Sequence, residues 1–164
     1  MAVVFDAPRK NTCCFTGHRR IPKQLLVPCR GYVLHYCRTL FFNEGVYRFI
    51  SGAATGFDTL AALAICELKR ELPEIELLLC LPYRGQASRW SPTDQKAHAR
   101  LLELADDVTC LSEFYLPECY HMRNRWMVDR AAHVLAYFEG RGGGTAYTLN
   151  YAEKQGVHIE IMEP

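Results

Sequence analysis

Apolar residues in this chain follow two alternating patterns. Short, largely apolar runs alternate with stretches in which apolar residues recur every three or four positions. The first pattern is typical of buried strands and the second of amphipathic helices. The predicted strands are 12–16, 47–50, 75–81, 107–111, 132–138 and 157–162. The predicted helices are 25–40, 56–72, 94–105, 122–130 and 145–155.

This strand–helix alternation predicts an α/β fold of Rossmann-like, three-layer type, a mostly parallel sheet with helices on both faces. The run 75–81 (IELLLCL) is apolar almost throughout, as expected of a strand covered on both sides. We predict a single domain over residues 1–164, with residues 1–11 as an N-terminal extension. In such folds ligands bind where the strands end and the loops enter the helices.

Composition narrows the possible partners. Of the 164 residues, 49% are apolar and 23% are charged, and the formal net charge is +1. The near-neutral charge argues against nucleic acid and against an acidic membrane surface as partners. No apolar run approaches the roughly 20 residues of a membrane helix, and no secretory signal is visible, so a cytoplasmic protein is expected. The sequence leaves open whether the chain forms a homo-oligomer.

The eight cysteines are scattered and include no C-x-x-C pair. This spacing predicts buried, reduced thiols and no metal site. No cofactor is expected, apart from a bound nucleotide of unknown identity. Cys119 lies in a polar segment and is predicted to be the most exposed thiol.

Two predicted loops combine glycine with groups that bind anions. After the first strand come Thr16, Gly17, His18 and Arg19. Glycine lets the backbone approach a ligand and arginine donates to phosphate, although a turn with solvated arginines explains the pattern too. His18 by itself is more often a hydrogen-bonding residue than a catalyst.

After the second strand, the segment 51–58 (SGAATGFD) opens a helix. It contains Gly52, Ala53, Gly56 and Asp58. Free amides at a helix start form an anion site, and Asp58 either caps the helix or accepts bonds from a ribose hydroxyl.

The loops after strands three and four offer stacking rings, an amide and cations. Gln86 is a candidate to read a base edge and Trp90 to stack, or the loop is simply anchored by a packed tryptophan. Arg123 and Arg125 are two residues apart on a predicted helix and therefore point to different faces. We expect one of them at most to face a ligand and the other to form a structural salt bridge.

The most specific local signal follows the fifth strand, where Gly142, Gly143 and Gly144 precede Thr145. Three consecutive glycines are costly in chain entropy, and a plain turn needs one. They favour a backbone that wraps closely around a phosphate, with Thr145 donating from the first helical turn.

Five motifs in this order resemble the SLOG superfamily, and within it the YpsA-like branch. They are CFTGHR (14–19), SGAATGFD (51–58), the loop with Pro82, Gln86 and Trp90, RNRWMVD (123–129) and GGTAYT (143–148). The superfamily includes the DNA-processing protein DprA and the lonely-guy phosphoribohydrolases. The resemblance implies a Rossmann-like fold whose glycine-rich turns bind or sense a nucleotide-derived phosphorylated ligand, of the ADP-ribose or NAD type.

Two alternatives remain at this point. One is a nucleotide-processing enzyme such as a nucleosidase or phosphoribohydrolase. Lonely-guy enzymes carry a catalytic glutamate where this chain has Thr148, so Asp58, His18 or Glu113 would have to supply the acid or base. The other is single-stranded DNA binding of the DprA kind. The sequence identifies neither the ligand nor a reaction.

Overall fold

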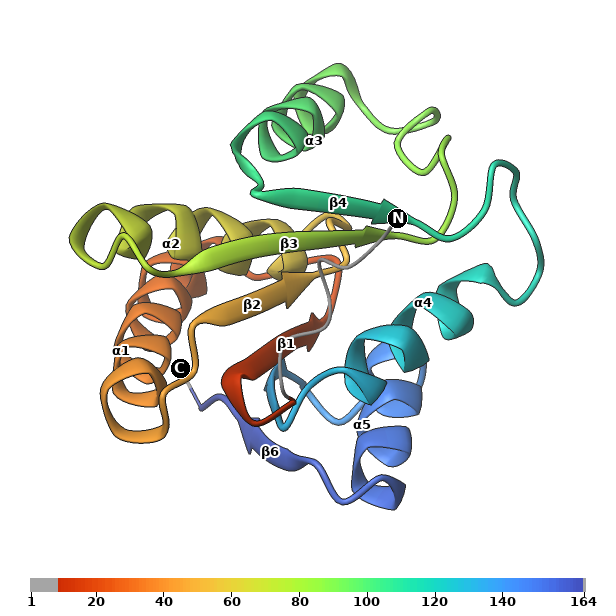
Figure 1. The fold of residues 1–164 in the computed structure, drawn as a ribbon. Helices are drawn as coiled ribbons and strands as arrows, with labels where there is room; N and C mark the ends of the chain where they lie inside the picture. Colours follow the sequence, from red (N-terminus) through yellow and green to blue (C-terminus); the bar gives the residue numbers. More distant parts are fainter. Residues whose placement is uncertain (1–8, 164) are drawn as a thin grey trace.

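The computed structural model describes residues 9–163 of the chain. Within this range six strands form one all-parallel sheet in the order β4-β3-β2-β1-β5-β6 (Figure 1). The first eight residues of the predicted N-terminal extension lie outside the described residues, and Arg9–Asn11 forms a short 3-10 helix. The strands are β1 (Thr12–Gly17), β2 (Arg48–Ser51), β3 (Glu76–Leu81), β4 (Asp107–Cys110), β5 (His133–Tyr137) and β6 (His158–Ile161).

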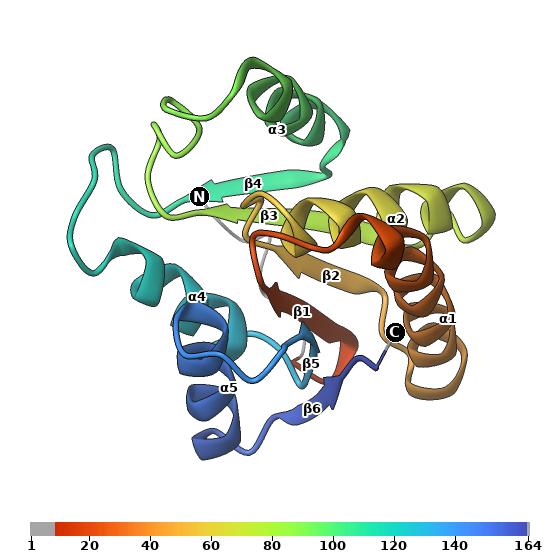
Figure 2. The ribbon, with the colours of Figure 1, turned by 180° about the vertical axis from the view of Figure 1, so that it is seen from behind.

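The helices cover both faces of this sheet. Helices α1, α2 and α3 lie together on one face, and α4 and α5 pack against each other on the opposite face (Figures 1 and 2). The result is the predicted three-layer, Rossmann-like α/β architecture. The helices are α1 (Leu26–Glu44), α2 (Phe57–Glu71), α3 (Pro92–Leu104), α4 (Cys119–Asp129) and α5 (Gly144–Lys154); a 3-10 turn, Lys23–Leu25, precedes α1.

Alternation along the strands divides the buried side chains into two cores. Phe15, Leu77 and Leu79 face α1 and α2, whereas Leu78 and Cys80 face α4 and α5. Successive side chains of a strand point to opposite faces, so a strand covered on both sides must be apolar at every position. This is the reason that β3 appears in the sequence as a continuous apolar run.

The chain order reverses beside β1. Strands β2, β3 and β4 extend the sheet from one side of β1, and β5 and β6 extend it from the other. The connections that leave β1 and β5 therefore diverge to opposite faces. At such a switch point the loops part and leave room for a ligand at the carboxyl ends of the strands.

Helix α4 starts earlier than predicted, and this changes the exposure of Cys119. The helix begins at Cys119 and not near residue 122, and its first turn packs the Cys119 side chain to 2% exposure. The prediction that Cys119 is the most exposed thiol was therefore wrong. All eight thiols are free of disulfides; Cys66 and Cys110 are partly exposed and the other six are buried.

Between residues 9 and 163, no helix is long and apolar enough to cross a membrane. The same residues contain no group of three or more His, Cys, Asp or Glu side chains placed to hold a metal ion.

A cavity at the switch point as the candidate functional site

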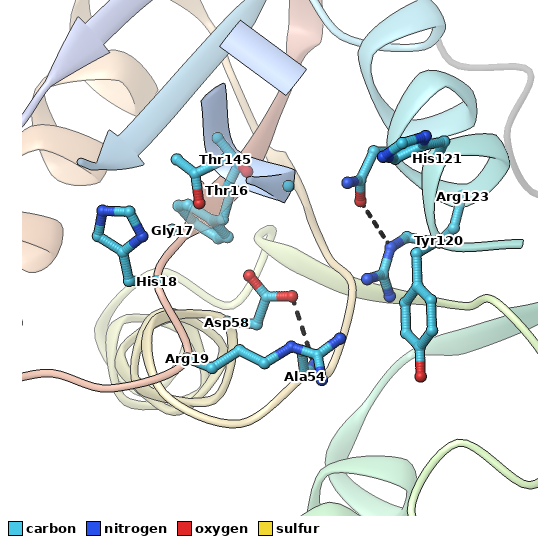
Figure 3. A pocket seen from close by; sticks show the side chains of 13 residues that line it. Thr16, Gly17, His18, Arg19, Ala54, Asp58, Tyr120, His121, Arg123 and Thr145 are labelled. Carbon is cyan, nitrogen blue, oxygen red and sulfur yellow. Dashed lines mark hydrogen bonds between the residues drawn. The ribbon is translucent and has the colours of Figure 1, made fainter. Parts of the chain in front are cut away.

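A cavity of about 400 Å³ opens at the carboxyl edge of the sheet, where β1 and β5 end (Figure 3). Residues from β1, from the starts of α2 and α5 and from α4 meet around it. Both the β2–α2 turn and the β5–α5 turn contribute to its wall, as the parallel topology requires. The lining residues are Phe15, Thr16, Gly17, His18, Arg19, Ala54, Asp58, Tyr120, His121, Arg123, Asn124, Gly144 and Thr145.

The end of β1 supplies an imidazole and a cation. The backbone N–H of Glu139 donates to Nε2 of His18 over 2.9 Å. Burial, followed by the nearby Arg141 charge, lowers the pKa of His18, and Glu139 partly opposes the shift. The ring is therefore neutral near pH 7, with its proton on Nδ1. Arg19 is exposed, and its guanidinium lies 5.0 Å from the centroid of the Tyr120 ring.

The β2–α2 turn is held from several sides. The carbonyl of Gly52 accepts hydrogen bonds from Arg123 Nη1 at 2.6 Å and from Gln86 Nε2 at 3.1 Å. Ala53 adopts a φ of 55°, an uncommon conformation for a residue with a Cβ, and its carbonyl lies 3.2 Å from Nδ1 of His98. These contacts fix the backbone that carries Ala54 into the cavity wall.

Asp58 and Arg123 place opposite charges inside this wall. Burial raises the pKa of Asp58, while the Arg123 charge, the Ala54 amide and the Arg19 charge oppose that shift. The Ala54 N–H donates to Asp58 Oδ2 at 3.3 Å, so the carboxylate closes the turn rather than capping α2. Arg123 is 4% exposed and also donates through Nε to Asn124 Oδ1 at 2.8 Å.

The β5–α5 turn is open. Gly143 precedes the first residue of α5 with a φ of 126°, and Gly144 and Thr145 form part of the cavity wall. The first amides of an α-helix have no partner within the helix, and the helix dipole makes that end positive. Within residues 9–163 the Thr16 and Thr145 hydroxyls have no hydrogen-bond partner. Donors for an anion thus converge here.

Half of the predicted site residues line the cavity. These are Thr16, Gly17, His18, Arg19, Asp58, Arg123, Gly144 and Thr145. Gly52, Ala53 and Gly56 lie in the turn behind the wall, and Gly142 and Gly143 are exposed beside it.

Three predicted residues lie elsewhere. Gln86 is 3% exposed and supports the Gly52 carbonyl, and the Trp90 ring packs edge-on against His98, with centroids 5.1 Å apart. Arg125 donates to the Tyr147 hydroxyl, so its partner is a phenol and not the predicted carboxylate. Arg123 lines the cavity and Arg125 does not.

Helix α4 contributes three residues to the cavity wall that were not predicted from the sequence. Tyr120, His121 and Asn124 line the cavity because the helix starts earlier than predicted. Tyr120 and Asn124 are four residues apart and therefore share a helix face with Arg123. The His121 ring stacks on Tyr147 with centroids 3.8 Å apart, which joins α4 to α5 at the cavity. The signal in the sequence was the i, i+4 spacing of these polar and aromatic side chains.

The fold and the cavity define the class: a Rossmann-like α/β protein with a ligand-sized cavity at the switch point of its sheet. Residues 31–163 match the YspA SLOG family (YpsA). The chain belongs to that family, which confirms the resemblance inferred from its motifs.

Two similar proteins come from Bacillus species. The SPbeta prophage-derived protein YoqJ of Bacillus subtilis (strain 168) is 30% identical over 141 residues, which cover 79% of this chain and 82% of YoqJ. A UPF0398 protein of Bacillus cereus (strain G9842) is 26% identical over 133 residues, 79% of this chain and 72% of the relative.

Solved structures of DNA processing protein A share the fold. The protein from Streptococcus pneumoniae superposes with a TM-score of 0.69 at 20% identity over 98% of this chain, which spans about half (52%) of that protein. The Helicobacter pylori protein, whose single-stranded DNA binding mode that structure describes, gives a TM-score of 0.66 at 18% identity, over 100% of this chain and 69% of its own.

Proposed function

We propose that this protein binds a nucleotide-derived phosphorylated ligand in the cavity at the switch point. One observation carries the proposal: the open start of α5, two hydroxyls without partners and the guanidinium of Arg19 all meet in one cavity. Helix amides, hydroxyls and arginine are the donors that bind phosphate in proteins. A cavity of about 400 Å³ also has the size of a small-molecule site.

The other wall suits the sugar and base of such a ligand. Asp58 offers acceptor oxygens to a ribose hydroxyl, and neutral His18 offers the Nδ1 proton. The Tyr120 ring, with the Arg19 guanidinium 5.0 Å above it, provides a face for a base. We therefore propose a ligand of the ADP-ribose or NAD type, and membership of the SLOG family supports a nucleotide-related role.

The site favours binding over N-glycosidic hydrolysis. Thr148, which stands where lonely-guy enzymes carry the glutamate, donates its hydroxyl to the Gly144 carbonyl at 2.8 Å inside α5. Glu113 is held by Arg84 outside the cavity. Asp58 is the one carboxylate among the lining residues, and it is already bonded to the Ala54 amide.

Calorimetry with ADP-ribose, NAD and AMP tests the proposal on the wild type, Arg19→Ala and Arg20→Ala. Arg19 lines the cavity and Arg20, its exposed neighbour, does not. Arg19→Ala should weaken binding by roughly tenfold or more, the scale of a charge-assisted hydrogen bond, and less so at high salt. Arg20→Ala should bind as the wild type does. Equal effects of the two variants, or no binding by the wild type, would overturn the proposal.

A second candidate is the binding of single-stranded DNA, which the fold shared with the Helicobacter pylori protein favours. In that case affinity for an oligo(dT) strand should fall steeply with salt, because phosphate contacts release counterions. AMP should then fail to compete with the strand. Competition by AMP at concentrations near its own Kd supports the small-ligand site instead.

A further inference from the structure

The loop between β4 and α4, residues 111–118, presents unusual exposed side chains. Phe114 is 78% exposed, Tyr115 58% and Leu116 45%. The loop stands away from the body of the molecule at the carboxyl edge of the sheet (Figures 1 and 2). Single exposed apolar residues are ordinary, but three in a row form a patch that calls for an explanation.

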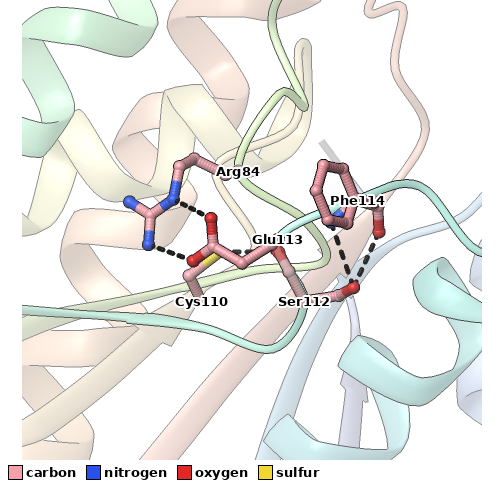
Figure 4. Close-up of polar contacts among 5 residues, drawn as sticks. All are labelled: Arg84, Cys110, Ser112, Glu113 and Phe114. Atoms are coloured by element: carbon pink, nitrogen blue, oxygen red, sulfur yellow. Dashed lines mark hydrogen bonds and ion pairs between the residues drawn. The ribbon is translucent and has the colours of Figure 1, made fainter.

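The backbone under this patch is held in place (Figure 4). Arg84 donates to both oxygens of Glu113, through Nε at 2.8 Å and Nη2 at 2.7 Å, and the Arg84 N–H donates to the Ser112 carbonyl at 3.0 Å. The Ser112 hydroxyl donates to the Phe114 carbonyl at 2.7 Å and accepts from the Phe114 N–H at 3.3 Å. The tip is therefore shaped in advance, which lowers the entropy that a ligand must overcome on binding.

A row of aromatic rings connects the patch to the cavity. Tyr120 lines the cavity, Tyr83 meets it edge-to-face at 6.2 Å, and Tyr115 meets Tyr83 edge-to-face at 5.6 Å. The Arg19 and Arg123 guanidinium groups lie 5.0 and 5.8 Å from the Tyr120 centroid at the cavity end of the row. The exposed Tyr115 ring is thus connected to the candidate site, and Phe114 is its neighbour in the chain.

The spacing determines which ligand can use both places. Tyr115 is two ring-to-ring steps, of 6.2 and 5.6 Å, from the Tyr120 ring in the cavity wall. A second nucleoside, joined through the phosphates, spans such a gap. Flat aromatic faces next to arginines are the surface on which nucleobases stack.

On the basis of the proposed function, we propose that the loop 111–118 is a second base subsite, so that the ligand is a dinucleotide. One nucleotide occupies the cavity with its phosphate at the start of α5, and the other stacks its base on Phe114 and Tyr115. The cavity, with its arginines, binds the linking phosphates. The Arg84–Glu113 ion pair has no net charge, so it supports the loop 111–118 without adding a phosphate contact.

Calorimetry with diadenosine diphosphate, ADP and AMP tests this assignment. The wild type should bind diadenosine diphosphate more tightly than either mononucleotide. Phe114→Leu keeps an apolar side chain without a ring, and it should lower affinity for diadenosine diphosphate by roughly tenfold while AMP binding stays unchanged. Phe114→Tyr should retain the affinity. Phe42→Leu, at a 66% exposed position on α1, is the matched control and should change nothing.

Several outcomes would overturn the dinucleotide assignment. The first is that Phe114→Leu loses affinity for AMP and for diadenosine diphosphate equally. The second is that the wild type binds the dinucleotide no more tightly than the mononucleotides. The third is that Phe114→Leu changes affinity for oligo(dT) and leaves dinucleotide binding unchanged. A changed sedimentation coefficient with unchanged affinity would assign the patch to self-association instead. If the wild type binds none of the three nucleotides, the proposed function of the cavity is wrong. That outcome differs from a loss of the loop 111–118 subsite alone, in which AMP still binds.

Discussion

The β2–α2 turn and the β5–α5 turn both carry glycines and both contribute to the cavity wall, but their surroundings are opposite. A Cβ built on Gly52 would meet Arg123 Nη1 at 2.5 Å, and one built on Gly56 would meet the Arg19 backbone at 2.4 Å. Cβ atoms built on Gly142, Gly143 and Gly144 meet nothing within 4 Å. The first turn is crowded by the protein itself, and the second is open.

The same residue type therefore answers two different physical demands. In the crowded turn, glycine allows the backbone of β2–α2 to approach β1 and α4 closely enough to bury Asp58 and Arg123. In the open turn, glycine supplies the conformation at Gly143 and leaves space in front of the α5 amides. Stability should depend on the first turn and ligand binding on the second.

The largest expected effect is on folding, from Gly56→Ala. Gly56 has a φ of 79° and its Cβ would overlap the Arg19 carbonyl, so strain and overlap act together. The free energy of unfolding should fall by about 3 kcal/mol. Urea denaturation measures it, with Gly142→Ala as the control in the open turn. Gly142→Ala should be neutral or more stable by up to about 1 kcal/mol. A comparable loss in both variants would abolish the distinction between the turns.

Next in size is the effect of Gly143→Val on binding. A branched side chain at a φ of 126° displaces the start of α5 and intrudes where the phosphate should lie. Affinity for AMP, NAD and ADP-ribose should fall roughly tenfold or more while the fold survives a strain of about 1–3 kcal/mol. Gly156→Val is the matched control, because Gly156 has a φ of 71° in open space just beyond the other end of α5. If folded Gly143→Val binds these ligands as the wild type does, the turn does not bind phosphate and its glycines serve only the turn conformation.

A smaller loss of affinity is expected from Thr145→Ala. The Thr145 hydroxyl lies in the cavity wall without a partner between residues 9 and 163, so we expect it to donate to the ligand phosphate. Its removal should cost about 1 kcal/mol of binding energy. Thr148→Ala, one turn further along α5, removes a hydroxyl bonded to Gly144 and should affect stability but not affinity. Calorimetry and thermal unfolding on both variants check this, and the reverse pattern would contradict it.

The smallest expected effect is a pH dependence of stability that comes from His18, which follows β1 and contacts the β5–α5 turn. The pKa of His18 is lowered in the folded protein, so between that value and the unfolded value the unfolded chain binds a proton that the folded chain does not. Stability should therefore fall as the pH drops through this window, below about 6.5.

Protonation also places a second N–H on the His18 ring, opposite the Glu139 N–H, and breaks their bond. Melting temperatures between pH 7.5 and pH 5.5 should show a shallower decline for His18→Gln than for the wild type. Identical slopes would exclude His18 as a contributor.

Much of this structure follows from local patterning. The alternation of apolar runs with helical spacing identified all six strands and five helices of the described residues, because strand and helix periods reflect burial directly. The parallel topology then predicts that Thr16, Asp58 and Thr145 lie at one edge of the sheet. The motifs at those positions were enough to place the chain in its family.

Tertiary structure decided which of the candidate side chains share the cavity. Gln86 and Trp90 have side chains suited to base recognition, but both contact other parts of the protein. Gln86 is buried and donates to the Gly52 carbonyl, because a buried polar group needs a hydrogen-bond partner. The Trp90 ring packs against His98. The start of α4 at Cys119 brought Tyr120 and His121 into the cavity wall, and the sequence prediction had placed both residues before the helix. Sequence spacing specifies which edge of the sheet a residue occupies, whereas the direction of its side chain depends on neighbours that are distant in the chain.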